Sequence, residues 1–253
     1  MSKCLTLLSA VLITITVSCL GDTAWAQGQT LALDFSSAVP GTIQDISGNG
    51  TGLTDRLPGT GSGLLTDDTN LALDTTDGLL TILSTNSDLN GQRDLDTGEY
   101  LGTSLASLGF TGHGNFRVKA RFVNIQYAED FDQFGLYVGA DSSHVFRCGW
   151  GHIFGPATLM TINNGGFDSG GGYGSQFVPA VGDTIVLTLF RQGANFGVTI
   201  HNLTHPGRSG VLTIPQPSFL NHYTNLYVGV FAANAGNGNV KTMTVDQYLV
   251  KVQ

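Results

Sequence analysis

The sequence predicts an all-β fold, a two-sheet antiparallel jelly-roll sandwich. Three observations lead to it: apolar and polar residues alternate with a period of two in many short runs, turn-forming residues separate these runs, and helix-favouring residues are scarce. Glycine accounts for 35 of 253 residues and charged residues for 12%. Beyond the N-terminal segment, glutamate occurs only at Glu99 and Glu129. No segment carries a 3.6-residue period long enough to predict a helix.

Residues 1–26 are expected to form a cleaved signal peptide. Lys3 precedes an apolar run that only Ser and Thr interrupt, and a small-x-small cleavage signal, "AWA", ends at Ala26. The run is too short for a comfortable membrane span and no second candidate follows, so we expect no membrane span. Residues 27–253 are then expected to be one exported domain, either secreted or periplasmic/extracellular. Cys148 would be its single cysteine, which excludes an internal disulfide.

The alternating runs predict which residues lie between the sheets. From Gln133 onward, the run "FDQFGLYVG" has apolar even positions and polar or glycine odd positions. The runs "NFGVTIHN" and "NLYVGVFAA" likewise place apolar residues at alternate positions. Cys148 shares its parity with Phe146 and Trp150, which predicts a buried thiol. The predicted inter-sheet core contains Phe134, Leu136, Val138, Phe196, Val198, Leu226 and Val228. Two irregular stretches, residues 45–70 and 163–177, are expected to be functional or loosely ordered.

The stretch from "FRVKARF" through "FDQFGLYVGADSSHVFRCGW" to "NLYVGVFAANAGNGNVKTMTVDQYLV" resembles the concanavalin A-like lectin/glucanase superfamily, as in laminin-G-like jelly rolls. The resemblance covers roughly residues 110–252. It implies a jelly roll in which a concave sheet often holds a glycan. Glucanase members carry Glu, Asp and Glu at alternating positions of one strand, and this chain has no such strand. Its nearest acidic cluster, Glu129, Asp130 and Asp132, precedes a strand instead of lying along it.

A candidate calcium loop lies at "NSDLNGQRD", residues 86–94. The candidate ligands are Asn86, Asp88, Asn90 and Asp94, spaced as alternating oxygen donors around a glycine turn. Thr97 stands where such a loop carries its bidentate glutamate. The alternative is a polar hairpin without an ion. Ca²⁺ is therefore the one candidate cofactor.

The polar faces of three runs predict a ligand-binding groove. If "FRVKARF", "DQFGLYVG" and "SHVFRCGWG" pair in sequence order, Arg117, Gln133, Tyr137 and Arg147 share one sheet face opposite the core. The glycines between them would leave this face open. Amides, guanidinium groups and a Tyr ring suit sugar hydroxyls and ring faces. The alternative is an ordinary solvated sheet face.

The sequence thus predicts a secreted, non-catalytic module that binds carbohydrate or a cell-surface partner, so the expected partner is a glycan or a cell-surface component. A glycoside hydrolase on the same fold and a purely structural or adhesive extracellular module are the alternatives. The formal net charge is −8 and no basic block occurs, so no nucleic acid partner is expected.

Overall fold

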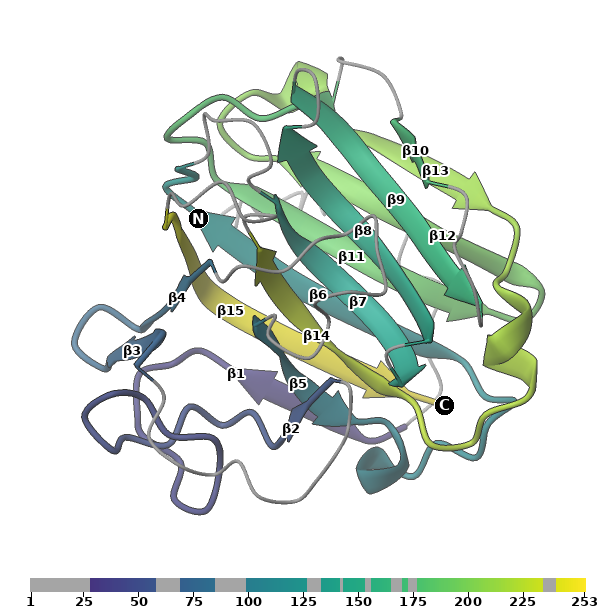
Figure 1. The fold of residues 1–253 in the computed structure, drawn as a ribbon, viewed down its shortest axis with the longest axis horizontal. Coiled ribbons are helices and arrows are strands. Elements are labelled where there is room, and N and C mark those ends of the chain that lie inside the picture. Colours follow the sequence, from purple (N-terminus) through teal and green to yellow (C-terminus); the bar gives the residue numbers. More distant parts are fainter. Residues whose placement is uncertain are drawn as a thin grey trace, which may run out of the picture.

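The computed structural model describes residues 28–57, 69–84, 99–126, 133–141, 143–152, 156–164, 170–172, 177–233 and 240–253. The expected signal peptide, residues 1–26, lies outside these ranges. Within them the chain forms two antiparallel sheets packed face to face, which confirms the predicted all-β sandwich (Figure 1). No helix among the described residues is long and apolar enough to cross a membrane.

The first sheet, which we call the eight-stranded sheet, lies behind the second in Figure 1. Its order is β13 (Gly210–Ile214), β12 (Asn195–Asn202), β11 (Ile185–Gln192), β6 (Phe116–Val123), β15 (Thr242–Val252), β4 (Leu79–Leu83) and β3 (Leu71–Asp74), with β1 (Thr30–Leu33) also paired to β15.

The second sheet, the seven-stranded sheet, faces the viewer in Figure 1. Its order is β10 (Gly170–Gly172), β9 (Pro156–Asn164), β8 (His144–His152), β7 (Gln133–Asp141), β14 (Tyr227–Ala233), β5 (Glu99–Ser104) and β2 (Asp55–Arg56). Three short 3₁₀ turns complete the described elements: η1 (Ala106–Leu108), η3 (Pro206–Arg208) and η4 (Ser218–Asn221).

The inter-sheet core forms where period-2 alternation puts it. Strand β6 alternates buried and half-buried residues along its whole length, and β11 does so up to its last residue. All seven residues predicted for the core belong to one buried apolar cluster between the sheets. Cys148 is fully buried in the same cluster, as predicted, and burial raises the pKa of its thiol well above the usual range.

The predicted pairing of β6 with β7 is wrong. Strand β6 lies between β11 and β15, whereas β7 lies between β14 and β8 in the other sheet. The chain leaves β6 at Asn124, whose φ of 50° ends the strand, and the next described strand, β7, belongs to the other sheet. Short connections favour hairpins, but a connection of this length does not require neighbouring strands to pair. The predicted β7–β8 pairing is correct.

Part of the first irregular stretch is held by one buried carboxylate. Asp45 is 2% exposed and accepts hydrogen bonds from the backbone N–H groups of Ser47, Asn49 and Leu73. Burial alone would raise the pKa of Asp45, but the three hydrogen bonds outweigh burial and lower the pKa. The sequence did not reveal this anchor, because Leu73 lies far along the chain.

Candidate functional site

The four predicted ligand-binding residues do not share one face. Gln133 and Tyr137 lie on β7 and Arg147 on β8, in the seven-stranded sheet. Arg117 lies on β6, half-buried on the outer side of the eight-stranded sheet. The predicted groove therefore cannot contain Arg117 together with the other three. The cause is the chain's crossing between sheets after β6.

Tyr137 and Arg147 belong to a second, smaller core and do not line an open groove. They are cross-strand partners on the face opposite the inter-sheet core, as strand parity predicted. However, Tyr137 is fully buried and Arg147 is 4% exposed. We call the apolar group around them the outer cluster. It consists of Leu57, Tyr100, Tyr137, Val145 and Phe231.

Aromatic contacts fix the outer cluster. The Tyr100 ring meets Tyr137 edge-on and stacks on Phe231, with ring centroids 5.5 Å apart in both pairs. Arg147 donates a hydrogen bond from Nη1 to the Tyr100 hydroxyl at 3.1 Å. A side-chain carbon placed at Gly102 would lie 2.8 Å from the Tyr137 hydroxyl. Gly102, two strands away, thus makes room for this tyrosine instead of opening the face to a ligand.

The Tyr137 hydroxyl has no hydrogen-bond partner among the described residues. Burial raises its pKa well above the usual range, so the hydroxyl stays protonated. An unpaired buried hydroxyl destabilises a fold, whereas the rings around Tyr137 are in close contact with one another. The outer cluster is therefore best described as packing.

Gln133 lies in a different environment, at the end of the sandwich. Four strand intervals separate it from Tyr137, or about 13 Å along β7. Gln133 lines a cavity of about 340 Å³. Its described lining is formed by Ser84, Phe122, Val123, Ile125, Gln126, Gln133, Phe134, Ala232, Ala233, Lys241, Thr242, Met243 and Thr244.

The floor of this end cavity is apolar and partly aromatic. Phe122 and Phe134 come from opposite sheets and meet edge-on, with ring centroids 5.6 Å apart. The Phe134 ring also contacts the Trp150 ring, with ring centroids 5.3 Å apart. Phe134 and Met243 keep 6% and 5% exposure, whereas Leu136, next along the inner face of β7, keeps 0%. Of these three residues, only the two that line the cavity contact solvent.

The polar side of the cavity is dominated by the Gln133 amide. Gln133 is 2% exposed, and both its Oε1 and its Nε2 lie buried without a hydrogen-bond partner among the described residues. Buried amides normally pair both atoms. The neighbouring polar groups of Ser84 and Lys241 bond each other. The Ser84 N–H donates to the Lys241 carbonyl at 2.7 Å and the Lys241 N–H donates to the Ser84 hydroxyl at 2.9 Å, which joins the end of β4 to the start of β15. Among the described lining residues, the Gln133 amide thus offers the cavity a hydrogen-bond donor and an acceptor that have no partner.

The sequence predicted a ligand-binding role for Gln133, which stays a prediction, and did not predict the residues around it. The cavity needs the ends of β4, β6, β7, β14 and β15 to converge, and Phe122, Ala232 and Met243 belong to strands far apart in the chain. A polar residue at the start of an otherwise apolar strand was the only local signal.

The calcium prediction concerns residues that lie outside the described ranges, as do Glu129, Asp130 and Asp132. Within the described parts of the chain, no group of three or more His, Cys, Asp or Glu side chains could hold a metal ion.

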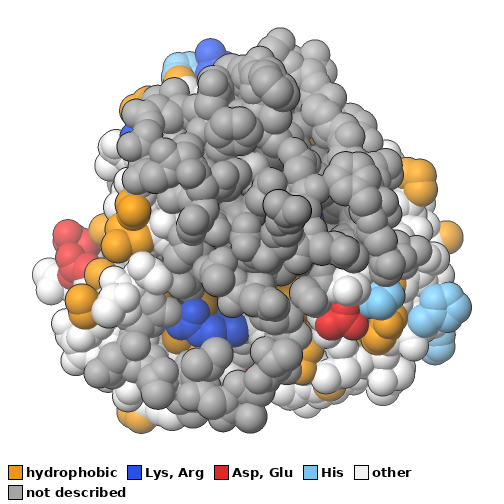
Figure 2. Space-filling view, viewed as in Figure 1, with side chains coloured by type: hydrophobic (Ala, Val, Ile, Leu, Met, Phe, Trp, Pro, Cys, Tyr) orange, Lys and Arg blue, Asp and Glu red, His pale blue; other side chains and the backbone are white. Residues whose placement is uncertain are grey.

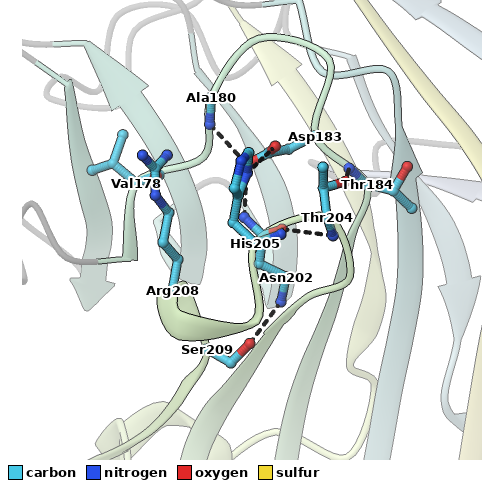
Figure 3. Close-up of polar contacts among 9 residues, drawn as sticks. All are labelled: Val178, Ala180, Asp183, Thr184, Asn202, Thr204, His205, Arg208 and Ser209. Atoms are coloured by element: carbon cyan, nitrogen blue, oxygen red, sulfur yellow. Dashed lines mark hydrogen bonds and ion pairs between the residues drawn. The ribbon is translucent and has the colours of Figure 1, made fainter.

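The buried carboxylate of Asp183 joins the loop before β11 to the loop after β12, at one end of the eight-stranded sheet (Figure 3). Asp183 is 1% exposed and accepts hydrogen bonds from the Ala180 N–H, the Asn202 amide and the His205 ring, at 2.7–2.8 Å. Burial raises the pKa of Asp183, but the bonds from Asn202, Ala180 and His205 outweigh this effect and lower it. Asn202 Oδ1 also accepts hydrogen bonds from the backbone N–H groups of Thr204 and His205. We call this set of bonds, which holds the two loops together, the clasp around Asp183.

Comparison with known proteins shows the fold. No protein-family profile matches the chain, and no curated protein is significantly similar to it. A protein of unknown function from Saccharomyces cerevisiae matches 72% of this chain and 91% of its own, with TM-score 0.53 and 17% identity. A xylan β-1,4-xylosidase from Bacillus halodurans C-125 covers 87% of this chain, with TM-score 0.58 and 12% identity. The GH43 protein BlXynB from Bacillus licheniformis covers 72%, with TM-score 0.55 and 14% identity.

The chain spans 38% and 34% of the lengths of these two Bacillus proteins. At such low identity the similarity extends to the architecture alone. The chain is therefore a two-sheet antiparallel β-sandwich, an architecture it shares with part of each Bacillus protein and with almost the whole of the yeast protein.

Proposed function

We propose that this chain is an exported, non-catalytic carbohydrate-binding module of the concanavalin A-like type, and that it holds a sugar in the end cavity. The observation that carries the proposal is the Gln133 amide, buried in the cavity with both polar atoms unpaired among the described residues. The empty space of about 340 Å³ includes the open mouth of the cavity, so the edge of one sugar ring with its hydroxyl groups, and not a whole oligosaccharide, would enter it.

The chemistry of the lining suits a sugar. Sugar hydroxyls donate and accept hydrogen bonds and so complement both atoms of an amide. The C–H groups of a sugar ring can contact the exposed edges of Phe134 and Met243, which keep 6% and 5% exposure at the cavity. No carboxylate lies among the described lining residues, so the lining offers binding groups and not the acid and base of glycoside hydrolysis.

The structural neighbours guide the choice of probe. Two of them are named for xylan or as GH43 proteins, so xylo-oligosaccharides join the first panel of glycans. The first measurement is a glycan-array screen of residues 27–253, followed by calorimetric titration of the best glycan.

The decisive variant is Gln133→Leu, which keeps the side-chain size and removes both polar atoms. Affinity should fall about tenfold or more, because the sugar hydroxyls lose their partner. Stability should stay level or rise, because an unpaired buried amide is replaced by an apolar group. Gln216→Leu is the control, since Gln216 is half-buried, donates a hydrogen bond to Asn221 and lies outside the cavity lining. Unchanged glycan affinity in Gln133→Leu would contradict the proposal, and hydrolysis of the glycan would favour the enzyme.

A further inference from the structure

The buried part of the end cavity is almost wholly apolar among the described residues. Its buried hydrophobic lining consists of Phe122, Ile125, Phe134, Ala232, Ala233 and Met243. Ser84 and Gln133 are the buried polar residues of the same described lining. The Ser84 hydroxyl already accepts a hydrogen bond from the Lys241 N–H at 2.9 Å. Among these residues, the Gln133 amide is therefore the polar group with both of its atoms unpaired, on a surface of hydrocarbon.

The other polar side chains of the described lining are nearer to solvent. Gln126 and Thr242 are exposed, whereas Lys241 and Thr244 are half-buried. The Gln126 amide donates a hydrogen bond to Asn124 at 3.3 Å. A ligand hydroxyl can therefore find a partner beside Gln133 or near the mouth of the cavity. A hydroxyl that enters elsewhere among the buried lining residues would meet carbon.

The Gln133 amide suits a particular arrangement of sugar hydroxyls. Its Oε1 accepts hydrogen bonds and its Nε2 donates them, and both atoms are bonded to the same carbon. Two hydroxyls on adjacent ring carbons match this pair, because one can donate to Oε1 while its neighbour accepts from Nε2. The small size of the cavity limits entry to one edge of a ring. That edge would carry the two hydroxyls and the ring carbon next to them.

The substituent on this next ring carbon then decides whether the edge fits. In a hexose it is a hydroxymethyl group, whose hydroxyl would be buried against the apolar lining without a partner. Such a hydroxyl lowers affinity by about tenfold or more. A pentose has only a methylene group at this position and a 6-deoxyhexose has a methyl group there. Either can contact Phe134 and Met243, which keep 6% and 5% exposure at the cavity.

We propose that the end cavity selects sugars without a hydroxymethyl hydroxyl, namely pentoses and 6-deoxyhexoses. Two adjacent sugar hydroxyls pair with Gln133, and the apolar ring edge beside them contacts Phe134 and Met243. The inference rests on the proposed function, because it concerns the same cavity, and it adds the class of sugar. It also gives Met243 a role in specificity.

The test compares sugars that differ only in this substituent. Methyl β-D-xyloside, methyl 6-deoxy-β-D-glucoside and methyl β-D-glucoside form one series. Methyl α-L-arabinopyranoside, methyl β-D-fucoside and methyl β-D-galactoside form a second. Each sugar is titrated into the whole exported chain, and binding is followed by NMR of the Gln133 side-chain amide. In a series that binds, the pentoside and the 6-deoxyhexoside should each bind about tenfold or more tightly than the hexoside. The tighter of these two identifies whether a methylene or a methyl group fits better.

Variants at two positions separate the apolar contact from the amide. Met243→Gln should reduce the preference to about threefold or less, because its new amide offers the hydroxymethyl hydroxyl a partner. Met243→Leu is the matched control, since it stays apolar and should keep the preference. Gln133→Leu should weaken the binding of every sugar by a similar factor, because all members of a series share the same ring hydroxyls. Melting temperatures establish that each variant is folded.

Three results would overturn the inference while the proposed function stands. The first is equal affinity for a hexoside and its 6-deoxy analogue, with Gln133 signals that shift on binding. The second is a preference that survives unchanged in folded Met243→Gln. The third is a glycan of the array that shifts the Gln133 signals although no member of either series binds. If no sugar of either series and no glycan of the array binds, the proposed function fails together with the inference.

Discussion

At the scale of single residues, strand parity predicted direction correctly but not exposure. Tyr137 points away from the inter-sheet core, as its odd position in "FDQFGLYVG" requires. It is nevertheless fully buried, because it packs with Leu57, Tyr100 and Phe231, which come from three other segments. A two-residue period reports which side of a sheet a residue faces. It does not report what covers that side.

Tyr137 should therefore behave as a core residue. Tyr137→Ala should lower the free energy of unfolding by about 3–5 kcal/mol, as for other large buried aromatic residues. Tyr137→Phe should be neutral or stabilising, because it removes a hydroxyl with no partner among the described residues. Urea denaturation of the two variants measures both effects. Tyr137→Ala with the stability of the parent chain would show that the outer cluster does not pack as described.

Gln133 illustrates the opposite outcome at the same scale. The sequence predicted that its amide would contact a ligand, and the amide is buried and unpaired in a cavity. Its predicted neighbours were wrong, because Tyr137 lies about 13 Å away along β7 and Arg117 lies in the other sheet. The role in binding stays a prediction.

At the scale of elements, the strands were predictable and their partners were only partly so. Alternation depends on local sequence, and β6, β7, β12 and β14 all occur where alternation predicts them. Pairing depends on connections. The β7–β8 pair follows from a short connection, since Asp141 pairs with His144, whereas β6 and the next described strand, β7, lie in different sheets.

The clasp around Asp183 gives one connection a specific pH dependence. The pKa of Asp183 is lowered in the folded state, so its stabilisation is complete above the unfolded pKa of about 3.9 and is lost as pH falls through the folded value. Asp183→Asn should lower stability at pH 7 by about 1–3 kcal/mol. It should also flatten the decline in stability below about pH 4. Urea denaturation across pH measures both, and a parallel decline in parent and variant would contradict this role.

The predicted calcium loop at residues 86–94 is tested by linkage. If the loop binds Ca²⁺, added calcium should raise the melting temperature by mass action, and Asp88→Ala should remove that rise. Magnesium serves as the control ion, because it prefers a smaller octahedral site. A parent chain whose melting temperature ignores calcium would favour the polar hairpin.

At the scale of the whole molecule, the fold separates two surfaces of different chemistry. The end cavity lies where strand ends of both sheets converge, and its described lining has one charged residue, Lys241. Basic residues of β6 and β15, namely Arg117, Lys119, Arg121 and Lys251, lie on the outer face of the eight-stranded sheet, away from the viewer in Figure 1. On the opposite side, Figure 2 shows Lys and Arg side chains gathered in the lower middle of the face. The overall acidity of the chain thus conceals local patches of positive charge.

The central claim is that the end cavity binds a sugar through Gln133, and side-chain NMR during a glycan titration tests it most directly. With the best glycan from the array, the Gln133 side-chain amide signals and the Met243 methyl signal should shift and saturate together. The amide signals of Gln216 should not move. Saturable binding that leaves Gln133 and Met243 unperturbed would contradict the account, because it would place the sugar elsewhere on the molecule.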